Sequence, residues 1–226
     1  MLISFLRLYY RLKNSFKPTH SSFDLLNECW RQTKVKKNKS WLKQKFLVVD
    51  LEMTSLDPKT GHILSIGWVT VEHGCLKLNS AEHHIIRSTQ TVGQSATIHQ
   101  LRDCEIEQGL SIVEISQLFL KASAGKVLVF HNAILDMAFL NKACRSIYGA
   151  PLLLNTADTL LLEKKKILRH KDHIPQGELR LAACRDRYNL PLYPAHNALM
   201  DAVATAELFC AIAHHKGANT YLKDLL

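Results

Sequence analysis

The sequence predicts an α/β domain with a mixed sheet, and two patterns support this. Strand-like apolar runs come first along the chain. After residue 110, one further run lies between segments with helical periodicity, and this order is typical of helices packed on a mixed sheet. The chain has 226 residues, of which 47% are hydrophobic, so it can bury a sizeable core and global disorder is excluded. The strand-like runs are FLVVD (46–50), ILSIGWVTV (63–71), CLKLN (75–79), EHHIIR (82–87) and KVLVFH (126–131).

Residues 1–45 are expected to form a basic, partly helical arm, and residues 46–226 the main domain. The arm holds eleven Lys and Arg against two acids, so the net charge of +9 lies there and the main domain is neutral. Such an arm favours a polyanionic partner, either nucleic acid or an acidic membrane surface, and an arm that only keeps the chain in solution is the alternative. Apolar residues at helical spacing predict helices in the first 16 residues and over 23–32, the second capped by Ser21 or Ser22. We expect their apolar faces to pack on the main domain rather than on a membrane.

In the main domain, FLVVD is an apolar run that ends in an acid, as expected of a buried central strand. The next two runs flank a turn signal and predict a hairpin, with EHHIIR as a third strand. Helices are expected over 112–119, 134–149, about 158–168, 178–188 and 197–215, and Gly149 ends the second of these. The six scattered cysteines favour a reduced, cytoplasmic protein, and the apolar run before Arg7 is too short to span a membrane.

Four acids stand where apolar elements begin or end. Asp50 and Glu52, at positions i and i+2 of an extended chain, point to the same side of the sheet. Asp136 and Asp201 each lie in the first turn of an apolar helix, and His196 stands at the start of the second. Each acid alone could be a helix cap or a solvated loop residue.

Together, the four carboxylates would form a cluster that is hard to keep ionised without a divalent metal. All-oxygen ligands favour hard ions such as Mg²⁺ or Mn²⁺, and a pair of such ions suits in-line phosphoryl displacement. The basic run Lys164–Lys166, with Arg169 and Lys171 beyond it, is usual for a helix face exposed to solvent. The alternative, that these side chains contact the phosphate backbone of a nucleic acid near the site, stays open.

Three motifs then resemble those of the DnaQ-like 3′–5′ exonucleases, in the DEDDh subgroup that includes the proofreading epsilon subunit of bacterial DNA polymerase III. They are D-L-E at 50–52, H-N-A-x-x-D at 131–136 and H-N-A-L-M-D at 196–201. The resemblance covers about residues 46–215. It implies a ribonuclease H-like sandwich, with a five-stranded mixed sheet flanked by helices on both faces.

The resemblance also implies the roles of individual residues. Asp50, Glu52, Asp136 and Asp201 would hold two Mg²⁺ or Mn²⁺ ions, and His196 would take the proton of the attacking water. The 3′-terminal nucleotide would be bound by a further set: Leu51, Met53, Thr54, Ile98, His99 and Asn132. Where the family commonly reads D-x-E-T-T-G, this chain has Met53 and Ser55, which changes the pocket for that nucleotide and leaves the metal ligands intact.

The sequence therefore predicts a metal-dependent 3′–5′ exonuclease that releases nucleoside 5′-monophosphates from single-stranded or frayed DNA ends. The same chemistry on RNA, as in oligoribonuclease or ribonuclease T, is the nearest alternative, because no pattern here identifies contacts to the 2′-hydroxyl. A non-catalytic module that binds nucleic acid or a polymerase is disfavoured, since all five catalytic positions are occupied. A phosphatase with Asp50 as nucleophile would leave the other motifs unexplained. A polymerase or another protein could bind through the N-terminal arm.

Overall fold

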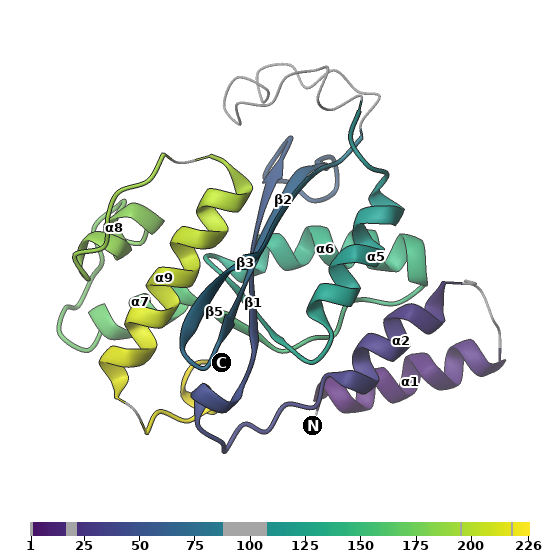
Figure 1. The fold of residues 1–226 in the computed structure, drawn as a ribbon, viewed down its shortest axis with the longest axis horizontal. Coiled ribbons are helices and arrows are strands. Elements are labelled where there is room, and N and C mark those ends of the chain that lie inside the picture. Colours follow the sequence, from purple (N-terminus) through teal and green to yellow (C-terminus); the bar gives the residue numbers. More distant parts are fainter. Residues whose placement is uncertain (1, 17–21, 88–107, 195, 218) are drawn as a thin grey trace.

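A five-stranded mixed sheet with helices on both faces forms the centre of the computed structural model (Figure 1), which describes all residues except 1, 17–21, 88–107, 195 and 218. The strand order is β3-β2-β1-β4-β5. Neighbours β1–β2 and β2–β3 pair antiparallel, whereas β1–β4 and β4–β5 pair parallel. The strands are β1 (Phe46–Met53), β2 (Ile63–Glu72), β3 (Cys75–Ile85), β4 (Val127–Phe130) and β5 (Thr156–Asp158). The predicted α/β class and mixed sheet are confirmed.

Helices cover the two faces of the sheet in separate groups. In Figure 1, α7, α8 and α9 lie on one side, and α1, α2, α5 and α6 on the other. The helices are α1 (Leu2–Phe16), α2 (Phe23–Gln32), α5 (Ile112–Ser123), α6 (Ala133–Tyr148), α7 (Thr159–Ile167), α8 (Leu181–Asp186) and α9 (Ala198–Lys216), with short 3-10 turns at Trp41–Lys43 and Leu222–Asp224. Alternate residues of β1 therefore enter two apolar cores, one on each face.

Two strand predictions need correction. CLKLN and EHHIIR belong mostly to one strand, β3, which stays paired with β2 through an irregularity between Trp68 and Thr70. The strand β5 has only three residues, too few to show a pattern in the sequence, and it ends at Asp158, where we had expected a helix to begin. The helix expected over 178–188 is shorter, at Leu181–Asp186.

The N-terminal 45 residues contribute to both cores. Phe23, Leu26 and Trp30 of α2 are buried against α5 and α6, and the Trp30 indole donates a hydrogen bond to the carbonyl of Leu152 at 2.6 Å. Trp41 is buried in the core on the α9 side. For α2 the expected packing is therefore confirmed, while a domain boundary at residue 45 stays a prediction.

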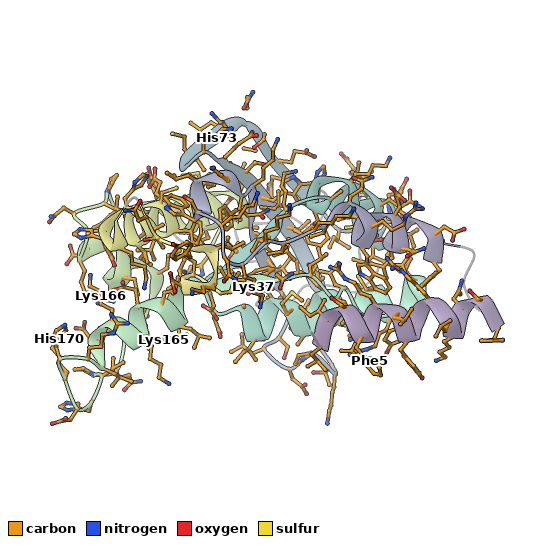
Figure 2. The ribbon with its side chains drawn as sticks, turned by 90° about the horizontal axis from the view of Figure 1, so that it is seen from below. Phe5, Lys37, His73, Lys165, Lys166 and His170 are labelled. Atoms are coloured by element: carbon orange, nitrogen blue, oxygen red, sulfur yellow. The ribbon has the colours of Figure 1, made fainter. Side chains whose placement is uncertain are left out.

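For α1 the expected packing is largely wrong, because this helix rests on the body by a mixed face of half-buried residues that includes Ile3, Leu6, Arg7 and Tyr10. The Arg7 guanidinium donates to the carbonyls of Leu153, Trp30 and Thr33 at 2.8–3.3 Å. The apolar face consequently points to solvent, and its exposed residues are Leu2, Phe5, Leu8, Tyr9, Leu12 and Phe16. Figure 2 shows Phe5 projecting from α1 away from the molecule. Among the described residues, no helix is both long enough and apolar enough to cross a bilayer.

Candidate active site

Alternation along β1 places two acids on the α9 side of the sheet. Val49 and Leu51 belong to the core on the opposite face, so Asp50 and Glu52 point toward α9. The regular pairing with β2 breaks between Glu52 and Met53. Both carboxylates therefore stand at the end of a rigid, buried strand.

A glycine on β2 lets α9 approach these acids. Gly67 lies opposite Asp50 in the β1–β2 register. A Cβ atom at Gly67 would lie 2.5 Å from the carbonyl oxygen of Ala198 and would also collide with the backbone nitrogen of Leu199. The first turn of α9 thus packs directly on the β2 backbone, a position that only glycine allows.

The start of α9 fixes the third acid. Asn197 caps the helix through its side-chain oxygen, which accepts a hydrogen bond from the Met200 N–H at 3.1 Å. His196 has a positive φ of 71°, and its N–H donates to the Asp201 carboxylate at 2.9 Å. Asp201 is therefore held in the first turn of α9, and the exposed His196 lies two residues before this helix begins.

Asp50, Glu52 and Asp201 come together, each with a carboxylate oxygen within 4.8 Å of the others. Burial raises the pKa of Asp50 well above its usual range, and the charges of Asp136, Asp201 and Glu52 raise it further. Burial, with the charge of Asp201, raises the pKa of Glu52 to about 7, and burial also raises the pKa of Asp201. Three acids that resist ionisation together form a site suited to a cation.

Asp136 reaches the site from the other face of the sheet. It lies in the first turn of α6 and is 5% exposed. Burial raises its pKa, while N–H donors, its own and that of Leu51, act in the opposite direction. The structure leaves Asp136 outside the three-acid group, although its charge is the largest electrostatic influence on Asp50.

Asp158 has a role that the sequence did not reveal. The side chain of Asn132, which directly precedes α6, makes no capping bond, and its φ is 86°. Instead, Asp158 accepts the N–H groups of Asn132 and Ala133 at 3.1 and 2.9 Å, and also that of Leu160 in α7 at 2.9 Å. One buried carboxylate thus caps two helices and fixes the loop that leads to Asp136.

The residues predicted to bind substrate have different surroundings. Leu51 is buried in the core, Met53 packs partly against it, and Asn132 is exposed at the start of α6. Thr54 pairs with His62 in the loop after β1, with its hydroxyl accepting the His62 N–H at 2.9 Å. Ile98 and His99 lie outside the described residues.

The donor set fits a hard divalent ion, because all three grouped ligands are carboxylates. The hydroxyl of Ser65, which lies opposite Glu52 on β2, is 1% exposed and has no hydrogen-bond partner in the described part of the chain. A buried hydroxyl requires a partner, and the water shell of an ion held by Glu52 would supply one. Nothing in the sequence pattern singled out Ser65.

Comparison with known proteins decides the family. The family model for exonucleases (RNase_T) matches residues 47–209, which include all four acids and His196. The chain belongs to the exonuclease family. This exonuclease is 27% identical over 173 residues to DNA polymerase III subunit epsilon of Rickettsia prowazekii, covering 74% of this chain and 72% of that protein. It is 28% identical over 165 residues to the PolC-type DNA polymerase III of Thermotoga petrophila, covering 73% of this chain and 11% of the polymerase. It thus spans about a tenth of that relative.

Solved structures confirm the fold. Cell-death related nuclease 4 aligns with a TM-score of 0.63 at 11% identity, covering 78% of this chain and 65% of the nuclease. Exonuclease I of E. coli in complex with a dT13 oligonucleotide also aligns with a TM-score of 0.63 at 11% identity, covering 76% and 42% of the two chains. Together with the family match and the DNA polymerase III relatives, this likeness confirms the predicted resemblance to DnaQ-like exonucleases, and the family match and these relatives confirm the predicted enzyme class.

Proposed function

We propose that the protein is a metal-dependent 3′–5′ exonuclease that releases nucleoside 5′-monophosphates from single-stranded or frayed DNA ends. The proposal rests on the three carboxylates of Asp50, Glu52 and Asp201, whose oxygens lie within 4.8 Å of one another. They lie in a chain that belongs to the exonuclease family. A buried group of this kind would be unfavourable without a cation, and in this family it is the expected place for phosphodiester hydrolysis.

Asp50, Glu52 and Asp201 would hold the metal, and Asp136 would contribute through its position beside Asp50. Two Mg²⁺ or Mn²⁺ ions, when bound, would supply the positive charge that activates water and neutralises the reacting phosphate. The strand β1 and the first turn of α9 keep these ligands fixed without substrate, because Gly67 packs them together. Preorganisation of this kind lowers the cost of assembling the reactive geometry.

His196 is the side chain we assign to proton transfer. It is exposed at the mouth of the site, and its backbone N–H anchors Asp201. The water oxygen would attack the terminal phosphorus while its proton moves to His196. The bond from phosphorus to the O3′ of the preceding nucleotide would break, and the departing O3′ would take a proton from solvent water, leaving a shortened strand with a 3′-hydroxyl and a free 5′-monophosphate.

The terminal nucleotide would be bound by residues around β1 and α6. Met53 ends β1, Thr54 follows it in the loop, and the exposed Asn132 directly precedes α6. Leu51 acts through its backbone N–H, which holds Asp136, rather than through its buried side chain. Ile98 and His99 keep their proposed role as further contacts with the base.

DNA is favoured over RNA as the substrate because the relatives include DNA polymerase III proteins and a nuclease solved with a DNA oligonucleotide. A protein partner, a polymerase or another, would meet the N-terminal arm, where the apolar face of α1 points to solvent. A cytoplasmic location stays a prediction.

Matched DNA and RNA 12-mers test the proposed substrate. With Mn²⁺, we expect the DNA strand to be shortened faster than the RNA strand, and Asp201→Ala to abolish both reactions. Equal rates of hydrolysis for the DNA and RNA strands would contradict the proposed preference for DNA. Release of mononucleotides by the Asp201→Ala variant at the wild-type rate would show that the site is elsewhere.

A further inference from the structure

A second concave surface lies at the far end of α9 from the acids. It is a pocket of about 830 Å³ between α7, the end of α9 and the C-terminal turn, and we call it the basic pocket. Five of its lining residues are lysines or arginines, namely Lys165, Lys166, Arg169, Lys216 and Lys223, and His170 and His215 also line it. Lys165, Lys166 and His170 lie together at one end of the molecule in Figure 2.

The acidic side chains that line this pocket offset only part of its charge. Glu163 is fully buried and already paired, since its carboxylate accepts from Arg187 at 2.9 Å and from the Tyr188 hydroxyl at 2.6 Å. Asp224 is the other acid, and it accepts the N–H of Tyr221 at 3.2 Å. The pocket therefore keeps a concentrated positive charge, although the main domain as a whole is neutral.

An aromatic ring stands among these cations. The Lys166 ammonium lies 4.3 Å from the centroid of the Tyr188 ring, and the His215 ring meets the same residue at 5.2 Å. The bond to Glu163 fixes the orientation of the Tyr188 ring. Cationic side chains around an aromatic ring are the combination that single-stranded nucleic acids bind, through phosphates and bases respectively.

The distance from the candidate active site sets the length of strand required. Asp201 and Lys216 stand on one helix, about 22 Å apart at 1.5 Å per residue. A stacked strand advances about 3.4 Å per nucleotide, so this distance corresponds to roughly six nucleotides.

A basic segment connects the two places. Residues 168–180 include the exposed Arg169, Lys171 and Arg180 and also two acids, Asp172 and Glu178, of which Glu178 is paired with Arg187. They run from the pocket toward the catalytic edge of the sheet. There the carbonyl of Leu179 lies 2.9 Å from the ring nitrogen of His131, the residue before Asn132. A strand leaving the acids would therefore pass the exposed Arg180, Lys171 and Arg169 on its way to the pocket.

We propose that the basic pocket binds the phosphate backbone of the substrate strand about six nucleotides away from the 3′ end that the acids hold. This inference rests on the proposed exonuclease function and adds a length requirement to it. Strands too short to reach the pocket are hydrolysed at the same site but bind more weakly, and longer strands bind through both places.

The test compares dT4 and dT12 with wild type, with Lys165→Glu/Lys216→Glu, and with Lys121→Glu/Arg145→Glu. The last pair carries the same charge change on exposed residues of α5 and α6. For the pocket variant we expect KM for dT12 to rise about tenfold at unchanged kcat, with dT4 unaffected. The salt slope of log kcat/KM for dT12 should weaken by about 1.4, for two lost phosphate contacts. The control variant should behave like wild type with both strands.

Equal losses on dT4 and dT12, or no loss on dT12, would overturn the proposal. A further outcome would also overturn it. If inorganic tripolyphosphate raises the melting temperature of wild type but not of the pocket variant, while both proteins hydrolyse dT12 with the same kinetics, the pocket binds a small polyanion rather than the substrate strand. If wild type shortens neither strand with Mn²⁺, the proposed function itself fails. Anisotropy of 5′-labelled dT12 in EDTA then tests the pocket alone, and equal affinity of wild type and variant would refute it.

Discussion

Replacing Gly67 by alanine tests whether the contact between β2 and α9 assembles the candidate active site. The added Cβ would lie 2.5 Å from the Ala198 oxygen, whereas ordinary contacts begin near 3.4 Å, so the first turn of α9 must move by about 1 Å. That turn carries Asp201, while Asp50 and Glu52 stay on β1. A displacement of this size can cost about 10²-fold in rate, and the overpacking costs about 1–3 kcal/mol of stability.

The assay is hydrolysis of a single-stranded DNA 12-mer with Mn²⁺, measured with the thermal unfolding of the same samples. Ile115→Val is the matched control, because Ile115 is 2% exposed on α5 and the change costs about 0.5–1.5 kcal/mol without touching α9. We expect Gly67→Ala to lose about 10²-fold in kcat while the control keeps its activity. Wild-type kcat in Gly67→Ala would refute the reasoning, and an equal loss in the control would assign the effect to stability.

Three other predictions follow from the structure. His196→Ala should lower kcat by about 10²–10⁴-fold, and an unchanged pH–rate profile in this variant would exclude His196 from proton transfer. In EDTA, stability should fall as pH rises from about 4.5 to about 7, because folded Glu52, with its pKa raised to about 7, keeps a proton that the unfolded chain has released. Melting curves with and without Mn²⁺ check this, and a melting temperature that stays constant with pH in EDTA would contradict it. Trp30→Ala should lose about 3–5 kcal/mol in denaturant unfolding, whereas an independent arm would leave stability unchanged.

The sequence predicted the catalytic half of the fold well because local pattern and tertiary packing agree there. The apolar run before Asp50 fits a buried strand, and the apolar helix around Asp201 shares a core with alternate residues of that strand. The side of this strand and of this helix on which the acids lie then follows from strand and helix geometry. The prediction could not include Gly67, whose role depends on the approach of a helix distant in sequence.

Elsewhere, side-chain hydrogen bonds override the pattern. The apolar spacing of α1 predicts an inward face, but the Arg7 guanidinium binds three carbonyls of the body and turns that face outward. At α6, Asp158 accepts the N–H groups of Asn132 and Ala133 and also that of Leu160 in α7, because its carboxylate faces two helix starts at once. Such contacts join residues far apart in sequence, and no local signal marks them.

The central claim, that these acids carry out metal-dependent hydrolysis from the 3′ end, is tested most directly by following a 5′-labelled DNA 12-mer over time. With Mg²⁺ or Mn²⁺, wild type should produce a ladder of products shortened one nucleotide at a time, whereas EDTA or Asp201→Asn should leave the 12-mer intact. Labelled mononucleotide as the first product, internal cuts, or the same ladder in EDTA would contradict the claim.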